Sequence, residues 1–543
     1  MNWRFLFASS LFLSSALLVA EETSLEKHEP ETGCLNIRNI IIKANDVYED
    51  DEEPNFFEST LNFLHFTTRD SVIQKELLFQ EGECLNQELV DETARNLRAF
   101  TIFSDARVTV VPAEESRSVD VIVMTKDRFT LRAEVGASSK SGTTKTRLSF
   151  GEKNIFGQNK ALYFSRTNED GEALARYVYS DNRFFYDYEF NAFYISARDG
   201  GLESYSFINP FRSLDDKSSY GISYAKNTQN FVLKLDGNEE LEIPQFHENQ
   251  TVFYAYEFGN RKNSERLGFS LSTSQQDYFS EQVNDQAGIP DRLEKVDFDV
   301  VRSLTDRDDF IVMQGLDSLT YLEDIELQHS LFFGLGVQWR EDLKGSEYHP
   351  KYQIGYSHSK WNQRDVLSSA YFNHKGRFYA GQLLETETTA FYHCYYLPKP
   401  GHVWLGGITY QYRYGRDILN DSLSMGGDVG LRGYETSSFT GNKSLLFNFE
   451  YRHRLPSKWS KIALGQAFFV DSGYAWKKGE NIAFEDLKAN VGWGLRLDMP
   501  SLFGDKLLRF DLAVATDTGE VLASIVIGQI FRYNELSETN KEF

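Results

Sequence analysis

The chain of 543 residues is acidic, with 57 Lys and Arg against 80 Asp and Glu and a formal net charge of -23 at pH 7. This balance argues against nucleic acid as a partner, because nucleic-acid binding depends on basic surfaces. Three cysteines are too few for a disulfide-dense scaffold. Aromatic residues make up 15% of the chain and prolines number 11, which favours a large membrane β-structure.

Residues 1–20 have the pattern of a secretory signal peptide. Arg4 lies near the start, an apolar run covers Leu6–Val19, and Ala20 precedes the expected cleavage site. No later stretch approaches ~18 consecutive apolar residues, so no membrane-spanning helix is predicted. We expect residues 21–33 to form a polar lead-in.

Residues 34–127 predict a small α/β domain. Hydrophobic periodicity indicates a strand, two helices and two further strands, in that order. These elements are expected over Leu35–Ala44, Ser71–Phe79, Asn86–Phe100, Ala106–Val111 and Val119–Met124. An insertion at residues 47–66 separates the first strand from the first helix. Its acidic run at residues 49–53 is interpreted as a solvated loop, with a binding surface as the alternative.

The cysteines of this domain lie at two separate points. Cys34 precedes the first strand, and Cys84 precedes the second helix. In an oxidising compartment the two could form a disulfide, but the sequence leaves their distance in space open. Cys394 lies in a later strand segment and is expected to be a packed free thiol.

From residue 128 to residue 531 the hydrophobic period is two almost throughout. In Leu445–Arg454, for example, Leu, Phe, Phe and Tyr alternate with a polar set that includes Glu450. Successive strand residues point to opposite faces, so each segment has one apolar and one polar face. A β-sandwich explains one or two such segments. A long series of them is typical of a membrane-spanning antiparallel β-barrel.

A glycine-rich loop at residues 425–439, MGGDVGLRGYETSSF, interrupts this series. Its glycines surround Arg432, which is followed by Gly433 and Tyr434. Glycine is used where the backbone needs a positive φ or a close approach to another surface, so we expect a compact loop that folds inward. An ordinary surface turn with a solvated arginine is the alternative.

The segment LRGY at Leu431–Tyr434 resembles a signature of the outer-membrane insertase superfamily, the BamA and TamA type. In that family the loop arginine folds into the barrel lumen. There it meets a glutamate on the next strand and the aspartate of an F-x-D motif on the strand after. The matching residues in FEYRHRLP and AFFVDSGYAW are Glu450, Phe469, Asp471 and Gly473. The resemblance therefore implies that Arg432 is held by the two carboxylates.

The same resemblance covers the order of the domains. Residues 34–127 resemble one POTRA module, the small periplasmic domain that precedes the barrel in this family. The resemblance implies an outer-membrane barrel of 16 strands over residues 128–531. More than 16 alternating segments can be counted, and we interpret the excess as strand extensions or halves of bent strands. Residues 532–543 then form a tail, which departs from the family pattern.

A closed barrel requires the first strand, near Phe129–Ser138, to pair with the last, near Leu522–Phe531. Gly136 interrupts the first strand, and Gly528 lies in the last strand, which ends at Phe531. Glycine inside a strand weakens it and allows bending. These glycines either accommodate curvature or make this seam easier to open.

No nucleophile, metal-ligand or phosphate-binding motif is convincing, so we expect neither an enzyme nor a cofactor. Two classes of function remain. The resemblance implies an outer-membrane protein assembly or translocation factor. Its POTRA domain would capture client polypeptides, and the barrel would open laterally at the seam into the surrounding lipid. The alternative is a passive outer-membrane channel or structural barrel.

Overall fold

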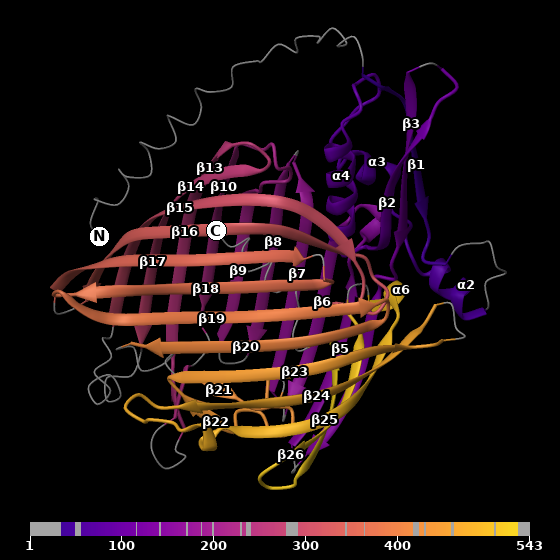
Figure 1. The fold of residues 1–543 in the computed structure, drawn as a ribbon. Coiled ribbons are helices and arrows are strands. Elements are labelled where there is room, and N and C mark those ends of the chain that lie inside the picture. The colour runs from indigo at the N-terminus through magenta and orange to yellow at the C-terminus, as the bar shows by residue number, and fades with distance from the viewer. Residues whose placement is uncertain are drawn as a thin grey trace.

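The computed structural model shows a small α/β domain followed by a large β-barrel (Figure 1). It describes residues 34–48, 56–115, 117–140, 143–169, 172–185, 187–197, 200–228, 231–234, 240–278, 292–342, 345–362, 364–415, 423–427, 430–457, 461–503 and 506–529. The expected signal peptide, lead-in, acidic run and tail lie outside these ranges. Among the described residues, no helix combines the length and the apolar character needed to cross a membrane.

The small domain has the predicted order of strand, helices and paired strands. Its elements are β1 (Asn36–Asn45), α2 (Phe56–Phe63), α3 (Asp70–Gln74), α4 (Gln87–Ala99), β2 (Phe103–Pro112) and β3 (Ser118–Asp127). The sheet order is β1-β3-β2, with β1 parallel and β2 antiparallel to β3. The insertion contributes α2, a helix that the sequence pattern did not reveal.

One buried stripe of β3 organises the core of this domain. Val119, Val121 and Val123 alternate along the strand and face inward, as the two-residue period requires. They pack in one cluster with Ile73 of α3 and Leu97 of α4. Cys34 and Cys84 form a disulfide that ties the start of β1 to the segment before α4.

The barrel is a closed antiparallel ring in which the structure describes twenty strands. They are β4 (Arg132–Lys140), β5 (Thr143–Glu152), β6 (Lys160–Glu169), β7 (Glu172–Phe184), β8 (Tyr188–Ala197), β9 (Gly200–Asn209), β10 (Ser218–Asn227), β13 (Gln245–Gly259), β14 (Asn263–Tyr278), β15 (Arg292–Met313), β16 (Glu323–Asp342), β17 (Gly345–Asn362), β18 (Val366–Tyr379), β19 (Gln382–Lys399), β20 (His402–Tyr414), β23 (Lys443–Leu455), β24 (Ala463–Trp476), β25 (Lys488–Asp498), β26 (Leu508–Ala515) and β27 (Val521–Ile527). Two pairs outside the ring are β11 (Phe231–Lys234) with β12 (Glu240–Ile243), and β21 (Leu423–Met425) with β22 (Phe439–Gly441).

The expected count of 16 strands is therefore wrong. The segments that we interpreted as extensions are separate strands of the ring. β8, for instance, pairs with β7 on one side and with β9 on the other. A hairpin extension would continue an existing strand, whereas each of these segments has two neighbours and widens the ring.

Strand length differs strongly around the ring. β15, β16 and β17 have 22, 20 and 18 residues, whereas β26, β27 and β4 have 8, 7 and 9. The ring closes where β27 lies next to β4. The wall is therefore shortest where the first and last strands meet, and fewer ladder hydrogen bonds are available there.

The small domain docks on turns at one end of the barrel, called the domain end below. Among the described residues, five ion pairs connect the two parts: Glu76–Arg183, Glu88–Arg261, Glu92–Arg261, Arg98–Asp324 and Glu58–Lys461. Arg98 bonds to both oxygens of Asp324, over 2.6 and 2.5 Å. Burial lowers the pKa of Arg98, but the hydrogen bonds and charge of Asp324 outweigh burial and raise it above its ordinary value. The barrel partners come from separate sectors of the ring.

Asp127, the last residue of β3, forms the joint between domain and barrel. Its Oδ2 accepts hydrogen bonds from the backbone N of Thr68 over 2.6 Å and from Thr68 Oγ1 over 3.0 Å, and lies 2.8 Å from Nε2 of His65. Asn154, in the β5–β6 turn, donates to the same Thr68 hydroxyl over 2.8 Å. Because these groups are buried, the joint is a specific polar contact and not a free linker.

Candidate functional site

The side chains of the site come from the inner faces of four consecutive strands. On β23, Asn448, Glu450 and Arg452 are buried, while Phe449 between them is exposed on the outer wall. β24 repeats the alternation, with Asp471 inside. β25 contributes Asn490 and Arg496 to the inner face, and β26 contributes Arg509 and Asp511. On all four strands the charged and amide side chains named here therefore share the inner face.

The glycine-rich loop connects β20 to β23 and enters the lumen. Leu431 and Arg432 are buried, and Leu431 packs in a cluster with Leu316, Met425 and Leu446. The loop closes on itself, because Gly427 N lies 3.0 Å from Leu431 O and 2.8 Å from Tyr434 O. The backbone at Gly427 has a φ of +59°, a conformation that glycine adopts without steric cost. The loop is therefore compact, and its Leu431 and Arg432 lie inside the barrel.

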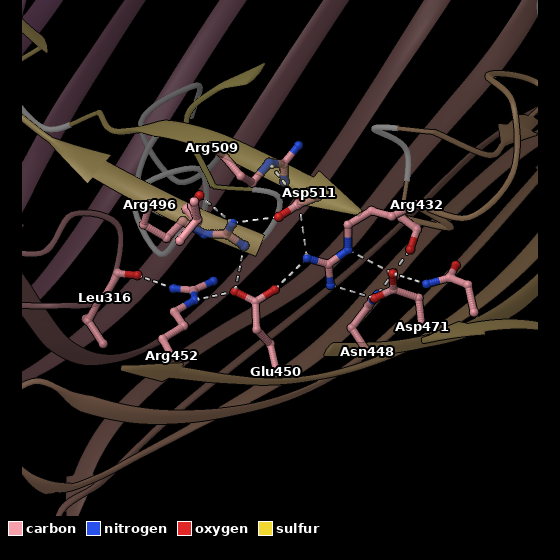
Figure 2. Close-up of polar contacts among 12 residues, drawn as sticks. Leu316, Arg432, Asn448, Glu450, Arg452, Asp471, Arg496, Arg509 and Asp511 are labelled. Carbon is pink, nitrogen blue, oxygen red and sulfur yellow. Dashed lines mark hydrogen bonds and ion pairs between the residues drawn. The ribbon is translucent and has the colours of Figure 1, made fainter. Parts of the chain in front are cut away.

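Arg432 contacts both carboxylates that the resemblance implied (Figure 2). Its Nη1 donates to Glu450 Oε2 over 2.6 Å. Its Nε and Nη2 donate to the two oxygens of Asp471, each over 2.8 Å. The guanidinium also lies over the ring of Phe469, 3.4 Å from the ring centroid. A bidentate pair combined with a stacked ring fixes the orientation of this planar group as well as its position.

The remaining loop residues pack equally closely. Gly433 N donates to Asn490 Oδ1 over 3.1 Å, and a Cβ at this position would lie 2.6 Å from Asn490 Cβ. Tyr434 donates its hydroxyl to Asp517 Oδ1 over 2.7 Å. At Gly473, a Cβ would meet the carbonyl oxygen of Leu445 at 2.5 Å. Arg432, Glu450, Phe469 and Asp471 thus meet at one place, while Gly433, Tyr434 and Gly473 contact Asn490, Asp517 and Leu445.

The structure adds residues that the motif did not identify. Arg496 Nη1 donates to Asp511 Oδ1 over 2.6 Å, and Arg509 Nε lies 3.2 Å from Asp511 Oδ2. Arg432 Nη1 is 3.7 Å from the same carboxylate. The signal that could have found them is the parity of the last strands, which places all of them on the polar face. Together with the motif they form the arginine cluster: Arg432, Arg452, Arg496, Arg509, Glu450, Asp471 and Asp511.

The arginine cluster holds four guanidinium groups and three carboxylates, and all seven side chains are buried. Buried charges are costly unless they are paired and hydrogen-bonded. Arg432 bonds to β23 and β24 and approaches β26, so a single loop residue connects strands on one side of the closure between β27 and β4. The physical effect of the arginine cluster is to hold the loop against this part of the wall.

A second segment enters the lumen from the domain end. The turn between β15 and β16 is held by Glu323, which accepts backbone N–H bonds from residues 316, 317 and 318 over 2.8–2.9 Å. Asp498 Oδ2 accepts from the backbone N of Leu319 and of Thr320, each over 2.9 Å. Arg452 then bonds to the carbonyl oxygen of Leu316. The loop and this turn therefore meet through the arginine cluster.

Of the described residues expected at the seam, which is the closure between β27 and β4, only Gly136 lies within a strand. Gly136 lies within β4, opposite Arg147 of β5, and a Cβ there would meet open space. Gly528 follows the end of β27 with a φ of +103°. The expectation that Gly528 lies inside the last strand is wrong, because this φ takes the backbone out of the extended region. Phe531 lies outside the described residues.

The rest of the lumen has a charged lining. A cavity of about 790 Å³ is bordered by residues of β15–β20. Opposite charges pair along its wall: Lys351 Nζ lies 2.5 Å from Asp297 Oδ1 and Lys375 Nζ lies 3.1 Å from Glu387 Oε2. Within the described ranges, no group of three or more His, Cys, Asp or Glu side chains is placed to hold a metal ion.

No protein-family model matches the chain, and no curated protein matches it. Among solved structures, it is similar to BamA from Haemophilus ducreyi lacking POTRA domains 1–3, at 14% identity and a TM-score of 0.37, over 91% of this chain and 84% of that one. It is also similar to CdiB from Acinetobacter baumannii, at 12% identity and a TM-score of 0.36, over 91% and 74%. CdiB from Escherichia coli matches at 11% identity and a TM-score of 0.42, over 94% and 92%. Such distant likenesses assign no role to individual residues.

Proposed function

We propose that the chain is an outer-membrane protein assembly or translocation factor of the insertase superfamily, with one POTRA domain in the periplasm. The observation that carries this proposal is the contact of Arg432 with Glu450 and Asp471. The loop, the glutamate strand and the aspartate strand occur in the order of the family motif, and the three charges meet inside a barrel. The small domain before the barrel fits the same architecture.

The shape of the barrel supports lateral opening at the closure between β27 and β4. β27 offers only seven residues for pairing, whereas β16 offers 20. A short wall is also crossed by fewer apolar residues, so the surrounding lipid is compressed there. A client strand could pair with the edge that opens, since unpaired N–H and C=O groups bind any extended chain.

The small domain offers edges of the same kind. In the sheet order β1-β3-β2, β1 and β2 are the edge strands. An extended client segment can add to such an edge through main-chain hydrogen bonds. Capture at the domain and release at the closure would then use one chemistry, the pairing of backbone strands.

A passive channel is the less favoured function. The loop residues Leu431 and Arg432 and the turn residue Leu316 are buried within the lumen. Several charge-assisted hydrogen bonds hold the loop and the turn there, an arrangement that a channel for small solutes does not require.

A disulfide across the closure tests the proposal. Gly136→Cys is combined in turn with Leu522→Cys, Ser524→Cys and Val526→Cys on β27, all in a Cys394→Ser background that removes the one described free thiol. Purified proteins in liposomes receive a urea-unfolded eight-stranded outer-membrane barrel, and its protease-protected fraction is measured. We expect oxidation to abolish insertion and reduction to restore it.

A matched control locks two strands away from the closure. Ser359 of β17 and Ser369 of β18 are paired in register and both are buried inside, so Ser359→Cys with Ser369→Cys should leave insertion unchanged. If the cross-closure disulfide forms and the oxidised protein inserts the client as fast as the reduced protein does, lateral opening is not the mechanism. Solute flux through the unlocked protein, without insertion, would instead support a channel.

A further inference from the structure

The helix inside the insertion, α2, has two different faces. On the docked face, Glu58 forms an ion pair with Lys461 over 2.6 Å, and Leu61 is buried against Tyr48. Asn62 Nδ2 donates to the carbonyl oxygen of Tyr48 over 2.8 Å. These contacts fix α2 on the rest of the protein and determine which side of it points away.

The opposite face of α2 is aromatic. Phe56 and Phe63 are seven residues apart, about two turns of an α-helix, and therefore project from the same side. They are 90% and 87% exposed. Removing such side chains from water is favourable, and neither residue gains this stabilisation while its ring is exposed. Leu64 and Phe66 continue the exposed apolar surface beyond the helix.

This aromatic face lies at the domain end, close to the closure of the barrel. Leu61 shares a cluster with Phe129, which precedes β4, and with Leu502 of α6 (Pro500–Phe503), which lies between β25 and β26. Figure 1 shows α2 and α6 near each other at this end of the barrel. The segment before β4 and the segment between β25 and β26 thus pack against the cluster that contains Leu61.

The exposed apolar surface continues onto the barrel wall. The ring of Phe66 packs edge-on against Phe156, with centroids 5.4 Å apart. Phe156 is itself exposed and follows β5, whose outer face presents Leu148 and Phe150. A line of exposed apolar side chains therefore runs from the wall through Phe156 and Phe66 toward α2.

The charges near this surface indicate what covers it. Glu58 is already paired with Lys461, and His65 is buried beside Asp127, so neither contributes charge to the aromatic face. Phe and Leu are common on the apolar face of helices that lie in the membrane interface. The chain carries a formal net charge of -23, which disfavours an anionic surface. A leaflet of zwitterionic lipid fits these features.

We propose that Phe56 and Phe63 insert into the membrane leaflet on the domain end of the barrel, beside the closure of the first and last strands. This inference rests on the membrane placement in the proposed function and not on the handling of clients. Helix α2 then attaches the small domain to lipid. This contact adds to the polar contacts between the small domain and the barrel turns.

Site-directed spin labelling tests the inference. A nitroxide is attached at Phe56→Cys or Phe63→Cys in the Cys394→Ser background, without reductant so that the Cys34–Cys84 disulfide stays intact. The protein is placed in phosphatidylcholine–phosphatidylethanolamine liposomes. Accessibility to oxygen, which concentrates in lipid, is compared with accessibility to a water-soluble nickel complex. We expect the ratio at both labels to favour oxygen.

Two control positions separate this inference from the proposed function. Leu335→Cys labels an exposed apolar residue on the outer wall of β16, and Glu114→Cys labels the exposed turn between β2 and β3. Oxygen-favoured ratios at Phe63 and Leu335, with a nickel-favoured ratio at Glu114, support the inference. A nickel-favoured ratio at Phe63 alone overturns it, and one at Leu335 contradicts the membrane placement itself. If Phe63 is shielded only after an unfolded polypeptide is added, the aromatic face binds clients and the lipid contact is wrong.

Discussion

Arg452 joins Leu316 to the arginine cluster. It donates one hydrogen bond to the carbonyl oxygen of Leu316 and another, over 2.7 Å, to Glu450 Oε1. Leu316 belongs to a turn at the domain end, while the other oxygen of Glu450 binds Arg432 of the loop from the opposite end. One glutamate thus links segments that enter the lumen from both ends of the barrel. Figure 2 shows this line of contacts.

Replacing Arg452 should release the turn. In Arg452→Leu the carbonyl of Leu316 loses its charged donor, an interaction that contributes about 1.5–3 kcal/mol. We expect amide hydrogen exchange in residues 314–322 to become about ten- to a hundredfold faster. Arg454→Leu, an exposed position on the same strand, is the matched control. Equal exchange rates in the two variants would show that Arg452 does not hold the turn.

Replacing Arg432 should destabilise the barrel. Arg432→Ala leaves Glu450 and Asp471 buried without this partner, and breaking a buried pair costs about 3–5 kcal/mol. The free energy of unfolding in guanidinium, followed by tryptophan fluorescence, measures the loss. Arg413→Ala is the control, since Arg413 is partly exposed and pairs with Glu387 over 3.3 Å. Its removal should cost about 0–1 kcal/mol, and comparable losses in both variants would contradict the assigned role of Arg432.

The space at Gly433 should not tolerate a side chain. A Cβ there would lie 2.6 Å from Asn490 Cβ and 3.1 Å from the backbone N of Ala515. Overpacking of this kind costs about 1–3 kcal/mol, so Gly433→Ala should lower the thermal unfolding midpoint. Gly406→Ala provides the control, because a Cβ at Gly406 meets nothing within 4 Å. An unchanged midpoint in Gly433→Ala would show that the loop packs less closely.

The disulfide should stabilise the small domain against unfolding. Cys34 and Cys84 are separated by 50 residues, and removing a disulfide from a small domain typically costs about 2–5 kcal/mol. We expect Cys34→Ser with Cys84→Ser to make residues 34–127 more sensitive to trypsin, while Cys394→Ser leaves digestion unchanged. If reductant does not increase the sensitivity of the unmodified protein, the disulfide is not the cause.

The sequence alone determined which side chains face the lumen. Successive side chains of a strand point to opposite faces. Glu450, Asp471 and Asp511 could therefore be placed on inner faces from the local alternation of polar and apolar residues. The motif then connected Arg432 to two of them. The order of helices and strands in the small domain could also be predicted from the sequence, because the hydrophobic periods of helices and strands differ within a few residues.

Only the tertiary structure decided how these faces combine. The count of twenty strands and the meeting of Arg496, Arg509 and Asp511 with the motif depend on register and ring closure, which are set by hydrogen bonds between distant strands. The contact of Arg452 with Leu316 spans 136 residues of sequence, and the docking of α2 likewise joins Glu58 to Lys461 across the chain. Local periodicity carries no information about such pairings, because the free energy that selects them belongs to the assembled barrel.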